Sequence, residues 1–134
     1  MSYWRLFYHA VWSTQDRQPL IDPGWEKELY GYLWGKATAL ECIPHAINGM
    51  PDHLHIVVSI PPRLAVADII GRLKGASSHH INERHPGFGF AWQGEYSVFS
   101  ISESSLDKVV SYVKAQKRHH SERMIIDLFE KTPE

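Results

Sequence analysis

Two periodicities of apolar side chains follow one another along this chain, one typical of strands and the other of helices. Residues 53–60 read HLHIVVSI, a run rich in β-branched side chains that begins after Pro51 and ends before a double proline. Because proline cannot donate to a sheet ladder, these boundaries and the apolar run predict a buried strand. Apolar runs between turn-forming residues predict three more strands, at residues 3–13, 42–49 and 91–102.

Three other segments repeat apolar residues every three to four positions, the spacing of an amphipathic helix. The first, residues 22–40, opens with an aspartate that can cap the helix and a proline suited to its first position. The second covers residues 64–84, and the third covers about residues 104–123. Either Ser102 or Ser104 is expected to cap the third helix.

The predicted elements follow one another in the order β-α-β-β-α-β-α within a single domain of residues 1–134. The first six are those of the ferredoxin-like motif, to which one C-terminal helix is added. We therefore predict an α+β fold, with a four-stranded antiparallel sheet that carries both crossover helices on one face. The other face is left for a ligand, a partner or the added helix. A fold of this kind hosts many activities, so function must be argued from the site.

Two histidines one residue apart occupy the predicted strand at residues 53–60. Side chains alternate between the faces of a strand, so His53 and His55 point the same way, opposite to their apolar neighbours. Three interpretations are open: partly buried sheet residues, a histidine-triad nucleotide hydrolase, or a metal site. Val57 takes the position where the histidine-triad enzymes carry their nucleophile, which weakens the second interpretation. Two imidazoles on one face can share a divalent ion if other ligands arrive from elsewhere.

The last predicted helix carries Tyr112 and Gln116, which project from the same helical face about one turn apart. A glutamine oxygen can ligate a hard cation, and a phenol can form covalent intermediates as a nucleophile. The structural alternative places Tyr112 at the edge of the core and Gln116 in solvent. Beside two histidines on a sheet face, that alternative becomes the weaker one, and the set favours a metal site with a reactive tyrosine.

Bulk composition changes this interpretation in a few respects only. The chain has 134 residues, 43% hydrophobic and 22% charged, enough for one globular core. No apolar run approaches the ~20 residues of a membrane helix, and no signal peptide is evident. Cys42, the single cysteine, excludes an internal disulfide, fits a reducing compartment and is interpreted as a small buried hydrophobe. The net charge of -1 argues against strong non-specific nucleic-acid binding, so any such site must be local.

Several motifs together resemble the single-tyrosine HUH transposases of small bacterial insertion sequences, a family that includes the REP-associated tyrosine transposases. HUH denotes histidine, a bulky apolar residue and histidine, and it is matched here within MPDHLHIVV. The family's tyrosine, followed four positions later by glutamine, is matched within SYVKAQ, and LKGASS between them also resembles the family. HAVWSTQDRQPLI resembles its first strand and loop, and FAWQGEYSVFSIS resembles its fourth strand. The resemblance covers nearly the whole chain, in order.

This resemblance implies a transposase that cleaves and rejoins single-stranded DNA by transesterification. Tyr112 would be the nucleophile and would form a 5′-phosphotyrosine, while His53, His55 and Gln116 would hold a divalent metal ion, Mg²⁺ or Mn²⁺. The substrate would be the hairpin-containing ends of an insertion sequence. The active unit would be a homodimer, in which the tyrosine helix serves its own subunit's histidines or its partner's. The expected location is a bacterial or archaeal cytoplasm, with no membrane partner.

Contacts with the DNA backbone are less sharply defined by the sequence. The residues of two segments that can bind phosphates are Arg72, Lys74, Ser77, Ser78, Lys117, Arg118, His119 and His120. A solvated helix face explains each of them equally well. Trp92 and Tyr96 can stack on unpaired bases, although aromatic residues in a sheet more often belong to the core. The remaining histidines, His9 and His45 among them, receive no role.

Two other functions stay open on the sequence. A domesticated transposase could keep the fold and bind a DNA or RNA hairpin without catalysis. The chain could also be an HUH nicking nuclease of replication, although those enzymes usually occupy longer chains with added domains. A pure binder has no reason to keep two histidines, a tyrosine and a glutamine in this arrangement, which favours the enzyme.

Overall fold

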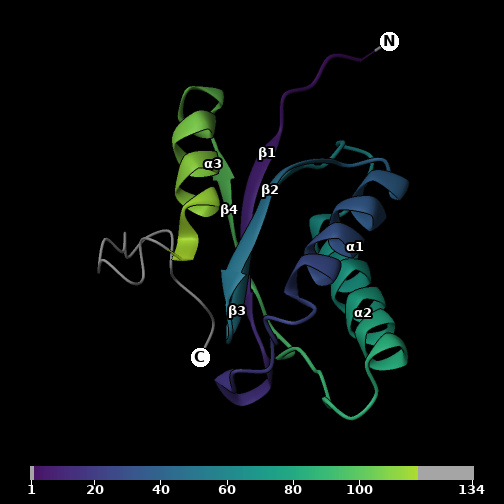
Figure 1. Ribbon diagram of the computed structural model, residues 1–134. Coiled ribbons are helices and arrows are strands. Elements are labelled where there is room, and N and C mark those ends of the chain that lie inside the picture. Colours follow the sequence, from purple (N-terminus) through teal and green to yellow (C-terminus); the bar gives the residue numbers. More distant parts are fainter. Residues whose placement is uncertain (1, 118–134) are drawn as a thin grey trace.

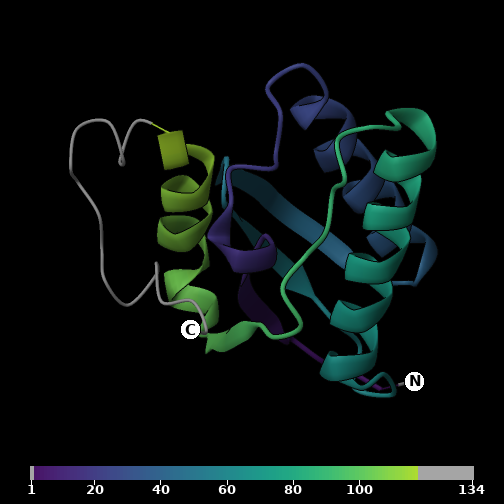
Figure 2. The same ribbon diagram turned by 90° about the horizontal axis from the view of Figure 1, so that it is seen from below.

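The computed structural model describes residues 2–117 and has the predicted α+β fold, with a four-stranded antiparallel sheet between two helical layers (Figure 1). Its helices and strands in chain order are β1 (Phe7–Ser13), α1 (Glu26–Ala39), β2 (Ile43–Met50), β3 (His53–Ser59), α2 (Val66–Arg84), β4 (Ser97–Ile101) and α3 (Leu106–Lys114). The strand order β2-β3-β1-β4 puts β3 and β1 at the centre of the sheet. α1 and α2 cover one face and α3 covers the other, as the view from below also shows (Figure 2).

Two strands are shorter in the structure than the sequence pattern predicts. β1 begins at Phe7 rather than at residue 3, because its ladders to β3 and β4 start only at Tyr8 and Phe7. β4 begins at Ser97 rather than at residue 91, and Trp92 joins the sheet only through an isolated bridge to Thr14. The aromatic pattern therefore extends beyond the residues that find a hydrogen-bonding partner strand.

The first helix starts later than predicted because of a turn in front of it. The Asp22 carboxylate accepts a hydrogen bond from the backbone N–H of Gly24 (2.8 Å), and the helix begins only at Glu26. Asp22 thus closes the preceding turn instead of capping α1. Within residues 2–117, no helix combines the length and the apolar character required to cross a membrane.

The last helix is shorter than the predicted residues 104–123. Residues 103–105 form a 3₁₀ turn, and α3 proper begins at Leu106 and ends at Lys114. Ser105 precedes α3, and Ser102 precedes the 3₁₀ turn that leads into it. Ser102 therefore takes a cap position before the turn, without a side-chain cap hydrogen bond, and Ser104 lies within the turn. Part of the predicted helix falls beyond residue 117 and lies outside the described residues.

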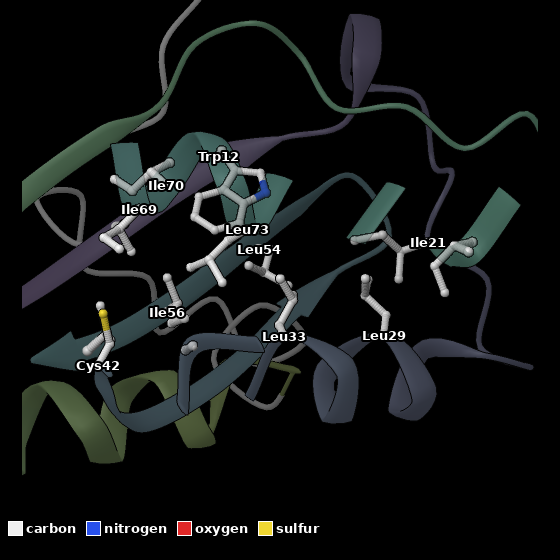
Figure 3. Packing of buried hydrophobic residues seen from close by; sticks show 14 of the residues in the cluster. Trp12, Ile21, Leu29, Leu33, Cys42, Leu54, Ile56, Ile69, Ile70 and Leu73 are labelled. Atoms are coloured by element: carbon white, nitrogen blue, oxygen red, sulfur yellow. The ribbon is translucent and has the colours of Figure 1, made fainter. Parts of the chain in front are cut away.

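The main core lies between the sheet and the helices α1 and α2. Leu54, Ile56 and Val58 of β3 point into it, as the predicted alternation requires, and pack with Trp12 of β1 (Figure 3). Each fully buried side chain of this size contributes roughly 1.5–3 kcal/mol. Cys42 belongs to the same core, which confirms its interpretation as a small buried hydrophobe.

A second, smaller cluster lies on the opposite face of the sheet, beneath α3. Val109, Tyr112 and Val113 of α3 pack there against Ala46 of β2 and Val57 of β3. The apolar stripe of the last helix is thus the surface that covers the sheet. The added helix, one of the three occupants considered for this face, covers it (Figure 1).

The end of α3 is tied to β2 by polar contacts. The Asn48 side-chain amide donates a hydrogen bond to the carbonyl oxygen of Lys114 (3.0 Å), and the Lys117 ammonium donates to the carbonyl oxygen of Gly49 (2.7 Å). Lys117 also pairs with the Glu26 carboxylate at the start of α1 (2.5 Å). These contacts hold the end of the tyrosine-bearing helix over the β2–β3 hairpin.

Gly49 is a position where β2 has no room for a side chain. A Cβ atom there would overlap the carbonyl oxygen of His53 and lie 3.0 Å from the Cα atom of Leu54. Both are backbone atoms of a central strand, so Gly49→Ala should displace β3 beside His53. We expect the free energy of unfolding to fall by about 1–3 kcal/mol, the usual cost of overpacking, as measured by chemical denaturation.

Gly31→Ala in α1 is the matched control for this prediction. A Cβ atom at Gly31 meets nothing within 4 Å, and alanine in a helix is more stable than glycine by roughly 0.5–1 kcal/mol. This control should therefore be as stable as the wild type or more so. Equal stability of the two alanine variants would contradict the close approach at Gly49.

Candidate active site

β3 presents His53 and His55 on the face that α3 covers. Their backbone partners on β1 are Ser13 and Val11, so the histidines lie at the centre of the sheet and not at its edge. The imidazole centroids are 5.2 Å apart, with their planes inclined by 69°. His53 is 3% exposed and His55 is fully buried. The predicted shared face is confirmed, and both rings are enclosed.

α3 brings Tyr112 to the same place. Its ring centroid lies 6.3 Å from that of His55, with the planes inclined by 73°. Tyr112 is buried in the small apolar cluster, so it packs against the core and adjoins a histidine at once. Gln116 follows just after the end of α3 and is fully buried, which excludes the alternative of a glutamine in solvent.

Asp52 orients the ring of His53. One of its carboxylate oxygens lies 2.7 Å from His53 Nδ1, and the other pairs with Arg17 at 3.3 Å. The hydrogen bond with His53 is the main cause that holds the pKa of the Asp52 carboxyl below its usual value, against the opposing effect of burial. The ionised carboxylate accepts the Nδ1 proton, which makes Nε2 the nitrogen through which His53 would ligate a metal ion.

His9, which received no role from the sequence, contacts His55 directly. His9 Nε2 lies 2.9 Å from His55 Nδ1, and the two rings stack with centroids 5.1 Å apart. His9 is buried on β1, two residues before Val11, the strand partner of His55. Alternation along β1 places His9 on the histidine face, but only the antiparallel register of β1 with β3 shows that the rings meet.

The donor set at this site fits a divalent ion with mixed ligands. Among residues 2–117, no group of three or more His, Cys, Asp or Glu side chains is placed to hold a metal ion. Within the described residues, a site on β3 would complete its ligand set with another residue type, and the buried Gln116 carries an amide oxygen. Two imidazoles and one amide oxygen suit Mn²⁺ and, with substrate oxygens added, Mg²⁺. Metal ligation by His53, His55 and Gln116 stays a prediction.

Some of the residues predicted to contact phosphates already form hydrogen bonds or ion pairs within the protein. Arg72 faces solvent and pairs with Asp68 one turn away (3.0 Å), and Ser78 is half-buried on the same helix. Lys117 is tied to β2 and α1 as described above. The residues of this set that lie outside the described part of the chain are Arg118, His119 and His120. As DNA contacts, all of them stay predictions.

Lys74 and Ser77 have structural contacts of their own on α2. The Lys74 ammonium donates hydrogen bonds to the carbonyl oxygens of Gln93 (2.6 Å) and Glu95 (3.0 Å), and burial lowers the pKa of this lysine. Ser77 is fully buried and accepts a hydrogen bond from Trp92 Nε1 (2.9 Å). Both join α2 to the segment before β4, so a role in DNA binding would be additional to these contacts.

Trp92 and Tyr96 line a groove of about 540 Å³ between α2 and the segment before β4, and Lys74 and Ser78 line it as well. Trp92 also packs edge-on against Trp12, with ring centroids 5.8 Å apart. The two interpretations of Trp92 are therefore compatible, since one edge belongs to the core and another faces the groove. An unpaired base could stack there.

A second cavity, of about 360 Å³, adjoins the histidines between β4 and α3. It is lined by His9 and Phe99 on the sheet and by Ser102, Ser105 and Lys108 before and on α3. Aromatic, hydroxyl and ammonium groups are those that contact bases and phosphates. This cavity therefore lies beside the imidazole of His9, which contacts His55.

Comparison with known proteins assigns a family to most of the chain. Residues 2–116 match the family described as "Transposase IS200 like". The chain is 27% identical over 121 residues to the ISDra2 transposase TnpA of Deinococcus radiodurans, which covers 84% of this chain and 85% of that protein. It is 26% identical over 125 residues to the transposase for insertion sequence element IS200 of Salmonella typhimurium, which covers 84% of this chain and 78% of that protein.

Solved structures share the fold as well. A crystal structure from Deinococcus radiodurans R1, assigned as a transposase, superposes with a TM-score of 0.69 at 25% identity and covers 87% of this chain and 95% of that chain. A REP-associated tyrosine transposase bound to a REP hairpin superposes with a TM-score of 0.67 at 15% identity, covering 90% of this chain and 74% of that chain. The second likeness establishes the fold alone.

Proposed function

This chain belongs to the IS200-like transposase family, and from that premise we propose that it cleaves and rejoins single-stranded DNA through a covalent bond to Tyr112. The observation that carries the proposal is the Tyr112 ring 6.3 Å from His55, with His53 beside it. A phenol next to two imidazoles combines a nucleophile with metal ligands, and phosphodiester transfer uses both. The family supports a transposase role, and the chemistry is inferred from these side chains.

In the proposed reaction, the Tyr112 oxygen attacks a backbone phosphorus in line with the 3′ oxygen. The bond from phosphorus to the tyrosine oxygen forms and the bond to the 3′ oxygen breaks. The phenol gives up one proton and the leaving 3′ oxygen takes one up. The products are a 5′-phosphotyrosine and a free 3′-OH. Because one phosphodiester replaces another, a second 3′-OH can reverse the step and join strands without ATP.

Residues around the phenol would bind the metal ion and orient its ligands for this step. His53, His55 and Gln116 would hold Mg²⁺ or Mn²⁺, which neutralises charge on the phosphoryl oxygens and orients the phosphate when bound. Asp52 keeps the His53 ring in the orientation that this binding needs. Since a free tyrosine phenol has a pKa near ~10, Tyr112 must lose its proton as it attacks.

DNA entry requires α3 to move, because the site is closed in this structure. Tyr112 and Gln116 are buried, and a phosphate cannot reach the phenol while the helix lies on the sheet. The contact of α3 with the sheet depends on a cluster of five buried residues, far smaller than the main core. The serine-rich turn at residues 102–105 precedes α3 and would serve as its hinge. Lifting α3 would expose the site and leave the main core intact.

The proposed substrate is single-stranded DNA that carries a hairpin, as at the ends of an insertion sequence. Support comes from the solved structure of similar fold that is bound to a REP hairpin. The groove beside Trp92 and the cavity beside His9 lie on opposite sides of the sheet and could each take unpaired nucleotides. With a net charge of -1, binding must depend on such local surfaces rather than on a general basic field.

The proposed active unit is a homodimer. β2 and β4 are the edges of the sheet, and edge strands present unpaired backbone groups that proteins normally protect. Apolar surface is present nearby, since Ile43 on β2 is 53% exposed and Tyr3 before β1 is 87% exposed. A two-fold pair would also hold two DNA ends together, as excision and joining require.

Tyr112→Phe should abolish the covalent adduct and leave DNA binding nearly unchanged, because it removes only the attacking oxygen. Labelled single-stranded DNA from the protein's own locus, incubated with Mg²⁺ or Mn²⁺ and run on a denaturing gel, reports the adduct. Tyr96→Phe is the matched control and should keep the adduct. An adduct that persists in Tyr112→Phe would show that another residue is the nucleophile. Tight hairpin binding by the wild type without any adduct would favour a non-catalytic binder.

His53→Ala and His55→Ala should each remove metal-dependent cleavage and weaken Mn²⁺ binding, measured by calorimetry on the folded variants. His45→Ala is the control, since this half-buried histidine of the same sheet contacts Ser59 Oγ (2.8 Å) and no predicted ligand. The control should bind Mn²⁺ like the wild type. If either test variant mainly loses its fold and the wild type binds no Mn²⁺, the two histidines have a structural role only.

Light scattering at working concentration should give the mass of a dimer. Mixing Tyr112→Phe protein with a His53→Ala, His55→Ala double variant, each inactive alone, then tests how the subunits share the site. Recovered adduct would show that the tyrosine of one subunit serves the histidines of the other. A dimer that recovers no adduct would show that the tyrosine serves the histidines of its own chain, as they lie in this structure. A monomer would contradict the proposal.

A further inference from the structure

His9 contacts the proposed metal ligand His55 and does not itself belong to the proposed ligand set. Its Nε2 atom lies 2.9 Å from Nδ1 of His55, and the two rings are stacked within 22° of parallel. His9 is 1% exposed, and its ring also lies near that of Phe99, with centroids 6.3 Å apart. A hydrogen bond between two imidazoles in a dry setting is both strong and directional.

The protons of this pair follow from the chemistry of metal binding. A neutral imidazole carries one N–H, and the nitrogen that ligates a metal must keep its lone pair. His55 engages His9 through Nδ1, so it would ligate through Nε2 and must then carry its proton on Nδ1. That proton would be donated to His9, which would accept it at Nε2 and keep its own proton on Nδ1; the contact of 2.9 Å between the two nitrogens fits this arrangement.

The same tautomer is imposed on His53 by a different group. Its Nδ1 proton is accepted by the Asp52 carboxylate at 2.7 Å. Both proposed ligands are thus held as Nδ1–H tautomers that direct Nε2 to the ion, one by a carboxylate and the other by a neutral imidazole. A neutral acceptor orients His55 without adding negative charge near the phosphate.

We propose that His9 is a positioning residue that holds His55 in the Nδ1–H tautomer and fixes its ring plane for metal binding. The metal-binding part of this inference rests on the proposed function, whereas the tautomer exists without any metal. His9 is not itself a further ligand to the same ion. Its Nε2 atom is occupied by the hydrogen bond to His55.

The first test reads the tautomer in metal-free protein. Long-range ¹H–¹⁵N spectra of protein labelled on histidine nitrogens distinguish a protonated Nδ1 from a protonated Nε2. We expect His55 to be protonated on Nδ1 in the wild type and to lose that preference in His9→Phe, which keeps a ring but has no acceptor. His9→Gln should restore it, because the amide oxygen reaches the place of Nε2. His45→Phe, the same exchange elsewhere in the sheet, should leave the His55 signals unchanged.

The second test measures Mn²⁺ affinity on the same proteins. Loss of a group that orients a metal ligand typically costs 10–100-fold in affinity, so His9→Phe should weaken Mn²⁺ binding by about 10–100-fold. His9→Gln should recover most of this loss, and a purely structural role would give no such recovery. If His9→Phe does not fold, His9→Leu removes the acceptor with a smaller side chain, and the same comparisons apply.

Four outcomes would either overturn the inference or separate it from the proposed function. His55 protonated on Nε2 in the wild type, or on Nδ1 in both His9→Phe and His9→Leu, would overturn the inference. Equal Mn²⁺ affinity in the wild type and in His9→Phe would do the same. A wild type that shows the Nδ1–H tautomer and its dependence on His9 but binds no Mn²⁺ would support the inference for the tautomer and refute the metal in the proposed function.

Discussion

The packing of α3 over the histidine face of the sheet is the contact on which the site depends. Val109 and Val113 pack beside Val57, and this contact places Tyr112 next to His55. Burial of apolar side chains of this size contributes roughly 1.5–3 kcal/mol each, and the ties at the end of the helix add to it. The same contact buries Tyr112 and Gln116. Under the proposed function, the free energy with which α3 docks would both assemble the reactive groups and oppose entry of the DNA.

Several polar side chains are buried at this interface, and they need partners to remain there. An unpaired polar group in an apolar setting costs several times more than a hydrogen bond contributes. Asp52 is the hydrogen-bond partner of His53, and His9 is that of His55. The site residues therefore hold the fold together as well as serving the proposed chemistry. Variants at these positions must be judged beside a measurement of folding.

Several positively charged side chains are engaged in contacts within the described part of the chain. Lys74 secures the segment before β4, and Lys117 secures the end of α3. Arg17 pairs with the carboxylate that orients His53. Affinity for DNA would then depend on grooves lined by aromatic and hydroxyl groups more than on free lysines, which predicts a shallow dependence of binding on salt.

The α+β fold and the order of its elements could be predicted from local sequence patterns, and so could the shared face of His53 and His55. The roles of these histidines, Tyr112 and Gln116 stay predictions. Periods of two and of about 3.6 residues are local properties, so strands, helices and their faces can be read without a structure. Local patterns could not fix where β1, β4 and α3 begin, because strand ends depend on partner strands and helix ends on neighbouring turns. The packing of α3 on the histidine face and the contact between His9 and His55 become visible only in the folded chain. The two histidines are 46 residues apart in the sequence, and their hydrogen bond depends on the register between β1 and β3. A register is a relation between distant segments, and neither segment contains it alone.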